Sequence, residues 1–82
     1  MAAPQDSLDQ LSDGELDALI RAAVAELTSR GTTESFALLV ALSGLVGTSL
    51  GEAARLVAER GSWSQVAQIS GTTKQAAWSR WR

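Results

Sequence analysis

The stretch from Phe36 to Val46, "FALLVALSGLV", most constrains what this chain can fold into. Read as a helix, it carries large apolar side chains around nearly its whole circumference, and a helix that is apolar on every side is buried on every side. One flanking helix in a chain of 82 residues cannot supply that cover. We therefore expect the same helix of a second copy to do so, in a homodimer. The residues predicted to form the dimer interface are Phe36, Leu39, Val40, Leu42, Leu45 and Val46. The alternative is a central helix wrapped by the other helices of its own chain.

Capping patterns mark where the helices on either side of this stretch begin. Ser12 with Glu15 three residues later predicts a capping box, and apolar residues at helical spacing then run to about residue 29. Gly31 is a typical residue to end that helix. Thr32 or Thr33 is expected to cap the next helix, which contains the apolar stretch.

The pattern around residues 47–60 permits two interpretations. Gly47-Thr48-Ser49 favours a break, and Ser49 with Glu52 fits a second capping box that opens a separate helix ending near Gly61. One helix over residues 33–60 stays open, because each glycine weakens a helix by only about 1 kcal/mol.

The last part of the chain predicts two short helices joined by a tight turn. Ser62 with Gln65 forms a third capping pattern, for a helix that ends near Ser70. Gly71 is the expected left-handed residue between the helices, and Thr72 or Thr73 caps the final one. No strand pattern occurs, so the expected fold class is all-α, with four to five helices. We expect a flexible arm over residues 1–11, a helical dimerisation region over 12–47 and, over 48–82, a region of short helices, all within one compact domain.

Composition excludes several function classes. The chain has no cysteine and no histidine, so disulfides, the usual zinc sites and histidine acid–base chemistry are ruled out. We expect no enzyme activity, no metal and no cofactor. The start lacks the features of a signal peptide, and the stretch 36–46 is shorter than the about 20 residues that span a bilayer. These features predict a cytoplasmic protein without a membrane partner.

Charge is distributed unevenly along the chain. Residues 1–47 carry seven acids and two arginines, a net charge of −5, whereas residues 48–82 carry five basic residues and two acids, a net charge of +3. Such asymmetry favours a polyanion as the partner of the basic end, although chance produces it in short chains too. Arg55 and Arg60 are expected on a solvated helix face, and Arg21 with Asp17 as an ordinary i,i+4 pair.

Two short helices joined by a glycine turn are the plan of a helix-turn-helix. Ala67 lies where the first helix must approach the second closely, and Ala77 lies on the inner face of the second helix. With Ser62-Trp63, Val66-Ala67, the run Gly71–Ala77 and Arg80-Trp81, the last 21 residues resemble bacterial helix-turn-helix DNA-binding proteins of an actinobacterial type. The stretch departs from that family at Ser70, where leucine is usual, and at Thr72, where valine is frequent.

The resemblance implies that the start of the second helix enters the major groove of duplex DNA. The implied reading residues are Thr73, Lys74, Gln75, Trp78, Ser79 and Arg82. Lys74 suits guanine and Gln75 suits adenine, whereas Arg82 is expected to add mostly affinity. Contacts to the DNA backbone are expected from Arg80, Ser62, Ser64 and Gln65. Trp63 and Trp81 are expected in the core, and Trp78 at the groove.

The sequence thus predicts a nucleoid-associated, sequence-specific binder of double-stranded DNA that acts as a homodimer, with residues 48–82 as its DNA-binding region. A transcriptional regulator or a plasmid or chromosome maintenance factor fits that description. The competing interpretation is a protein-interaction adaptor, whose acidic apolar helices bind another protein.

Overall fold

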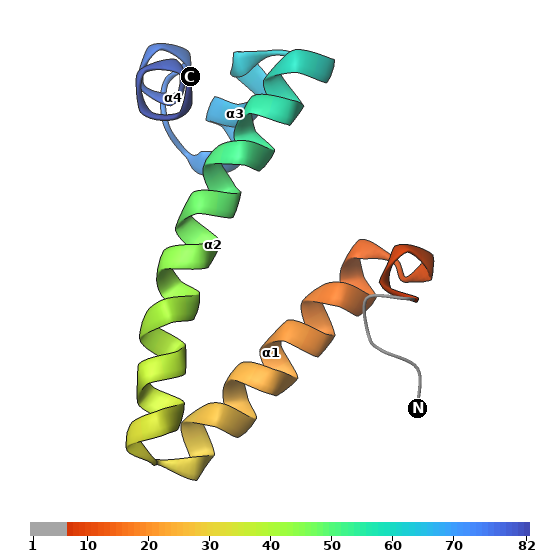
Figure 1. Ribbon diagram of the computed structural model, residues 1–82. Helices are drawn as coiled ribbons and strands as arrows, with labels where there is room; N and C mark the ends of the chain where they lie inside the picture. The colour runs from red at the N-terminus through yellow and green to blue at the C-terminus, as the bar shows by residue number, and fades with distance from the viewer. Residues whose placement is uncertain (1–6) are drawn as a thin grey trace. The chain divides into compact units, whose positions relative to one another are not determined.

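The computed structural model describes residues 7–82, and this part of the chain contains four α-helices and no strand (Figure 1). The all-α class expected from the sequence is confirmed. The helices are α1 (Asp13–Arg30), α2 (Thr33–Arg60), α3 (Trp63–Ser70) and α4 (Lys74–Trp81). Leu8–Gln10 forms one 3-10 turn, labelled η2, within the arm predicted for residues 1–11, and residues 1–6 of that arm lie outside the described part.

The chain divides into two compact units, one ending at Val40 and one running from Ala41 to Arg82. The first unit contains α1 and the first residues of α2. The second contains the rest of α2 with α3 and α4. Each unit is described by itself below.

Local hydrogen bonds define α1 as the sequence predicts. Ser12 Oγ accepts a hydrogen bond from Glu15 N at 3.1 Å, and Ser12 N donates to Glu15 Oε1 at 3.0 Å, which completes the capping box. Gly31 ends the helix in the left-handed conformation, with φ of 59°. The predicted pair of Arg21 with Asp17 is present at 2.9 Å, on the exposed surface.

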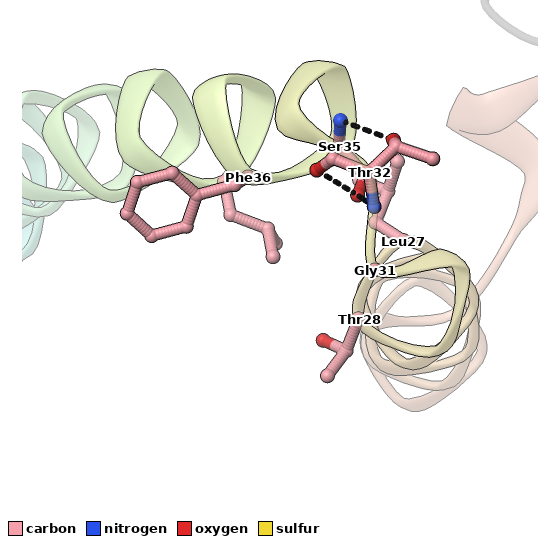
Figure 2. A pocket seen from close by; sticks show the side chains of 7 residues that line it. Leu27, Thr28, Gly31, Thr32, Ser35 and Phe36 are labelled. Carbon is pink, nitrogen blue, oxygen red and sulfur yellow. Dashed lines mark hydrogen bonds between the residues drawn. The ribbon is translucent and has the colours of Figure 1, made fainter.

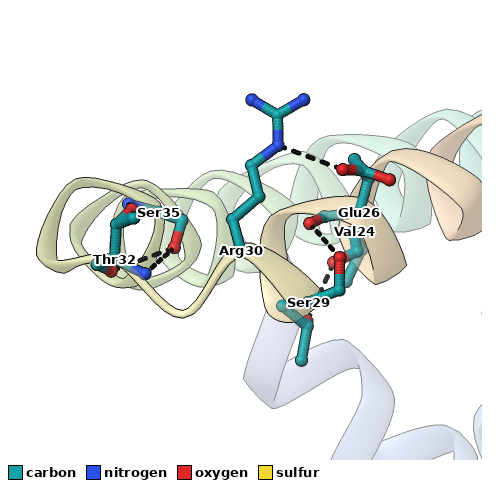
Figure 3. Close-up of polar contacts among 7 residues, drawn as sticks. Val24, Glu26, Ser29, Arg30, Thr32 and Ser35 are labelled. Carbon is teal, nitrogen blue, oxygen red and sulfur yellow. Dashed lines mark hydrogen bonds and ion pairs between the residues drawn. The ribbon is translucent and has the colours of Figure 1, made fainter.

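A second capping arrangement joins α1 to α2. Thr32 N donates to Ser35 Oγ at 3.1 Å, and Ser35 N donates to Thr32 Oγ1 at 3.0 Å (Figures 2 and 3). Thr32 is therefore the cap, one of the two residues that the sequence allowed. Beside it, the last turn of α1 carries an ion pair of Arg30 with Glu26 at 3.1 Å (Figure 3). Ser35 is buried, and its backbone N–H and its hydroxyl are both hydrogen-bonded to Thr32, so this corner has a defined local geometry.

An open groove of about 310 Å³ lies at the same corner (Figure 2). Its lining is mainly apolar, with Leu27, Phe36 and Leu39 contributing the large side chains. Phe36 is 68% exposed, so the groove offers apolar surface that the first unit leaves uncovered.

The predicted break at Gly47-Thr48-Ser49 is wrong, because α2 runs without interruption from Thr33 to Arg60. Ser49 lies inside the helix, and the capping box predicted for Ser49 and Glu52 therefore does not open a helix there. Gly47 does not adopt a positive φ. No proline enforces a break, and the small cost of interior glycines is offset by continued backbone hydrogen bonding.

The middle of α2 exposes much apolar surface. Val40, Leu45 and Val46 are more than half exposed, whereas Leu39 and Leu42 are half-buried. The uninterrupted helix is also long and apolar enough to cross a membrane by length and composition, a criterion that core helices of soluble proteins meet too. The stretch 36–46 alone underestimates this length, since residues 35–51 carry no charge.

The core of the second unit lies where α3 and α4 meet the C-terminal part of α2. It consists of Ala54 from α2, Val66 and Ala67 from α3, and Ala77 and Trp81 from α4. Ala58 and Trp63 pack against this cluster. Three of the five buried residues are alanines, so the helices approach closely and a single indole fills most of the remaining space.

Candidate nucleic-acid interface

The turn between α3 and α4 is a tight one with a left-handed glycine, as the sequence predicts. Ser62 and Gln65 form their capping box at the start of α3, as predicted. Gly71 adopts the left-handed conformation with φ of 72°, and Thr72 N donates to Ala67 O at 3.0 Å, a Schellman-type closure. Because a residue with a Cβ atom is strained at such a φ, glycine is the residue this turn requires.

Thr73 begins α4. Its Oγ1 accepts a hydrogen bond from Ala76 N at 3.1 Å, which satisfies one of the free donors of the first turn. Of the two threonines that the sequence allowed, Thr73 is the cap. Its hydroxyl hydrogen is not used by that bond, so Thr73 still has a donor at the start of the helix.

Two alanines let α4 pack closely against its neighbours. Ala77 is 0% exposed and Ala67 is buried, as predicted for the inner faces of the two helices. Trp81 is buried one turn beyond Ala77 and is part of the same core. The prediction of a core role for Trp81 is confirmed, and Trp63 is half-buried against that core.

The opposite side of α4 is a continuous exposed face. Gln75, Trp78, Ser79 and Arg82 follow the i, i+3, i+4, i+7 spacing of one helix face, and all four are exposed. Trp78 is 40% exposed, in agreement with its predicted place outside the core. This face, which we call the outward face of α4, presents an amide, an indole, a hydroxyl and a guanidinium together.

The remaining residues predicted to contact DNA lie at other positions of α3 and α4 and at the start of α3. Lys74 is exposed at the first residue of α4. Arg80 lies over the ring of Trp81, with Cζ 4.9 Å from its centroid, and therefore on a different side of α4 from Arg82. Ser64 is exposed on α3, whereas Ser62 and Gln65 use side-chain atoms in their capping box.

Arg55 has a role that sequence reasoning missed. Its Nη1 donates to the carbonyl oxygen of Trp81 at 3.0 Å, a partly buried hydrogen bond that joins α2 to the C-terminal end of α4. Arg55 is exposed, as predicted, but its guanidinium also has a specific partner that the sequence did not predict. The cation meets one of the carbonyls that a helix end leaves without an intrahelical partner, and the charge also suits the negative end of the helix dipole. No local sequence signal predicts this contact, because residues 48–61 carry two arginines and two glutamates and no net charge.

The charge of this region favours an anionic partner. Residues 61–82 hold Lys74, Arg80 and Arg82 and no acidic residue. Each of these three side chains lies on α4 or directly at its end. A polyanion that approaches α4 therefore meets positive charge without opposing carboxylates from α3 or α4.

No protein-family model, curated protein or solved structure matches the chain. The helix-turn-helix resemblance consequently rests on residues 62–82 alone, and its functional meaning is a proposal.

Proposed function

We propose that the protein is a sequence-specific binder of double-stranded DNA that acts as a homodimer, as a transcriptional regulator or a plasmid or chromosome maintenance factor. In this proposal α3 and α4 form a helix-turn-helix, and α4 lies in the major groove. Bases are read by Thr73, Lys74, Gln75, Trp78, Ser79 and Arg82. The DNA backbone is contacted by Arg80, Ser62, Ser64 and Gln65.

The observation that carries the proposal is the outward face of α4. It combines base-reading side chains with positive charge on a short helix whose other side is fixed by Ala77 and Trp81. The capped turn at Gly71 and the hydrogen bond from Arg55 hold both ends of α4. A reading helix needs this combination, because a base contact gains specificity only when the side chain arrives in a defined position.

Dimerisation follows from the weakness of one helix-turn-helix alone. Near α4 one chain offers Lys74, Arg80 and Arg82, together with Arg55, which is bound to the carbonyl oxygen of Trp81, so it neutralises few phosphates. Two copies double that number, and the joining of the two binding heads raises their effective concentration. The exposed apolar residues of α2, including Val40 and Val46, are the proposed interface between copies.

Selection of bound sequences from random duplex DNA tests the reading role. The expected result is a palindromic consensus. Gln75→Ala should weaken binding to it by about 1–3 kcal/mol and relax the preference at one base pair in each half-site. Gln68→Ala is the matched control, because Gln68 is an exposed glutamine of α3 outside the reading set. An unchanged consensus for Gln75→Ala would show that α4 does not lie in the groove in this register.

Sedimentation at micromolar concentration tests the dimer. The wild type should have about twice the 8.6 kDa mass of one chain. Val46→Glu should dissociate it while the helix stays folded, since Val46 is 60% exposed in the single chain. Thr48→Glu, an exposed position outside the interface, should leave the dimer intact. A wild-type monomer, or flotation with lipid vesicles in place of self-association, would refute this part of the proposal.

A protein-interaction adaptor is the second candidate, favoured by the acidic character of residues 1–47 and the exposed apolar residues of α2. In that case no duplex is enriched over the random pool, and Val46→Glu abolishes binding of a protein partner. The selection experiment therefore separates the two functions.

A further inference from the structure

The outward face of α4 ends in a stacked pair of side chains. Arg82 Cζ lies over the Trp78 ring, 4.4 Å from its centroid. Both residues are exposed, and they are one helical turn apart. The similar pair of Arg80 with Trp81 differs, because Trp81 is buried in the core. Only the Trp78–Arg82 pair presents an indole and a guanidinium together on the outward face.

Stacking prepares the Arg82 guanidinium to read a base. The ring of Trp78 lies against the guanidinium and limits the orientations of a long, flexible side chain. Within residues 7–82 the Arg82 guanidinium has no hydrogen bond or ion pair besides this ring contact, so its N–H donors remain available. A planar fork of donors matches O6 and N7 of guanine as well as two oxygens of a phosphate, and the exposed face of α4 favours the base edge.

We propose that Trp78 and Arg82 together read a thymine–guanine step, an inference that rests on the proposed function. The guanidinium donates to O6 and N7 of the guanine, and the indole edge packs on the C5-methyl group of the neighbouring thymine. Arg82 is then a specificity-determining residue, in place of the mostly electrostatic role expected from the sequence.

The pairing has a consequence for modified DNA. The methyl group of 5-methylcytosine occupies the same C5 position as the methyl group of thymine. A methylated cytosine–guanine step therefore offers the pair the same apolar contact and the same guanine edge. The unmethylated step lacks the contact with Trp78.

Selection and binding measurements with variants test the proposal. The wild-type consensus should contain a thymine–guanine step in each half-site. Arg82→Ala should lose the guanine preference, with affinity for that site falling about 5- to 150-fold, the range for loss of one bidentate base contact. Arg82→Lys should keep part of the preference, because lysine still donates to guanine but lacks the planar fork. Arg80→Ala, which removes an equal charge on another side of α4, should weaken all duplexes alike.

Base analogues isolate the methyl contact. Deoxyuridine in place of the thymine should weaken wild-type binding about 4-fold, the effect expected for one buried methyl group. A 5-methylcytosine–guanine step should restore wild-type affinity, and an unmethylated cytosine–guanine step should not. Trp78→Ala should bind all three duplexes equally.

The outcomes separate this inference from the proposed function. Suppose Arg82→Ala keeps the wild-type consensus, or deoxyuridine has no effect on the wild type. The pair then does not read this step, while the helix-turn-helix proposal stands on the consensus itself. Failure to enrich any duplex would overturn both.

Discussion

Replacement of Arg55 by alanine tests whether the hydrogen bond from α2 stabilises the packing of α4. The hydrogen bond from Arg55 Nη1 to Trp81 O joins two residues 26 positions apart in the sequence and links α2 to the end of α4. A buried hydrogen bond to a charged group contributes about 1.5–3 kcal/mol. This bond is only partly buried, so we expect Arg55→Ala to lower the free energy of unfolding by about 1–1.5 kcal/mol.

Urea denaturation followed by circular dichroism measures the effect, with every variant at the same protein concentration because a dimer's stability depends on it. Arg60→Ala is the control, since Arg60 is an exposed arginine at the end of the same helix. The free energy of unfolding of Arg55→Lys should lie between those of the wild type and Arg55→Ala. Lysine keeps the positive charge near the helix end but lacks the planar guanidinium that makes the hydrogen bond. Equal effects of Arg55→Ala and Arg60→Ala would refute the reasoning.

Three further substitutions probe single features of the fold. Thr73→Ala should lower the free energy of unfolding by about 1 kcal/mol through loss of the helix cap, while Thr72→Ala should cost less than about 0.5 kcal/mol; equal costs in thermal or urea denaturation would contradict the assigned cap. Gly51→Ala should stabilise the protein by about 0.5–1 kcal/mol, because the added Cβ would meet neighbouring side-chain atoms at 3.6 Å, an ordinary contact, and a loss of stability would contradict that packing. The hydrogen bonds from Ser12 hold the pKa of Glu15 below its ordinary value of 4.5, so its contribution to stability is present above pH 4.5 and is lost as the pH falls through the lowered pKa. The stability of Glu15→Gln should therefore differ most from that of the wild type above pH 4.5. A stability difference that grows at lower pH would contradict the lowered pKa.

Local features of the fold were predictable because their causes are local. Ser12 with Glu15 and Ser62 with Gln65 specify helix starts through bonds to residues three positions away. Gly31 and Gly71 specify helix ends through a backbone conformation that other residues rarely adopt. Signals of this kind are complete within a few residues of sequence.

Features that depend on competing or distant energies were not predictable. α2 continues across Gly47 because the hydrogen bonds of a continuous helix outweigh, by a small margin, the free-energy cost of glycine inside it. The sequence pattern favoured a break at this point. The bond of Arg55 to Trp81 joins residues that no local pattern connects. The exposure of Trp78 and Arg82 agrees with the sequence analysis, whereas their ring contact is one that i,i+4 spacing allows but does not require.

Affinity for paired and single half-sites tests the central claim most directly. With the selected consensus as a labelled duplex, the palindrome should bind far more tightly than an isolated half-site, and its affinity should fall steeply from about 50 to 200 mM salt. Inserting about 5 base pairs between the half-sites should abolish the advantage, because it turns the second major groove to the opposite side of the duplex. If the palindrome, the half-site and the insertion duplex all bind weakly and alike, the two helix-turn-helix units of a dimer do not bind two half-sites together, and the account is wrong.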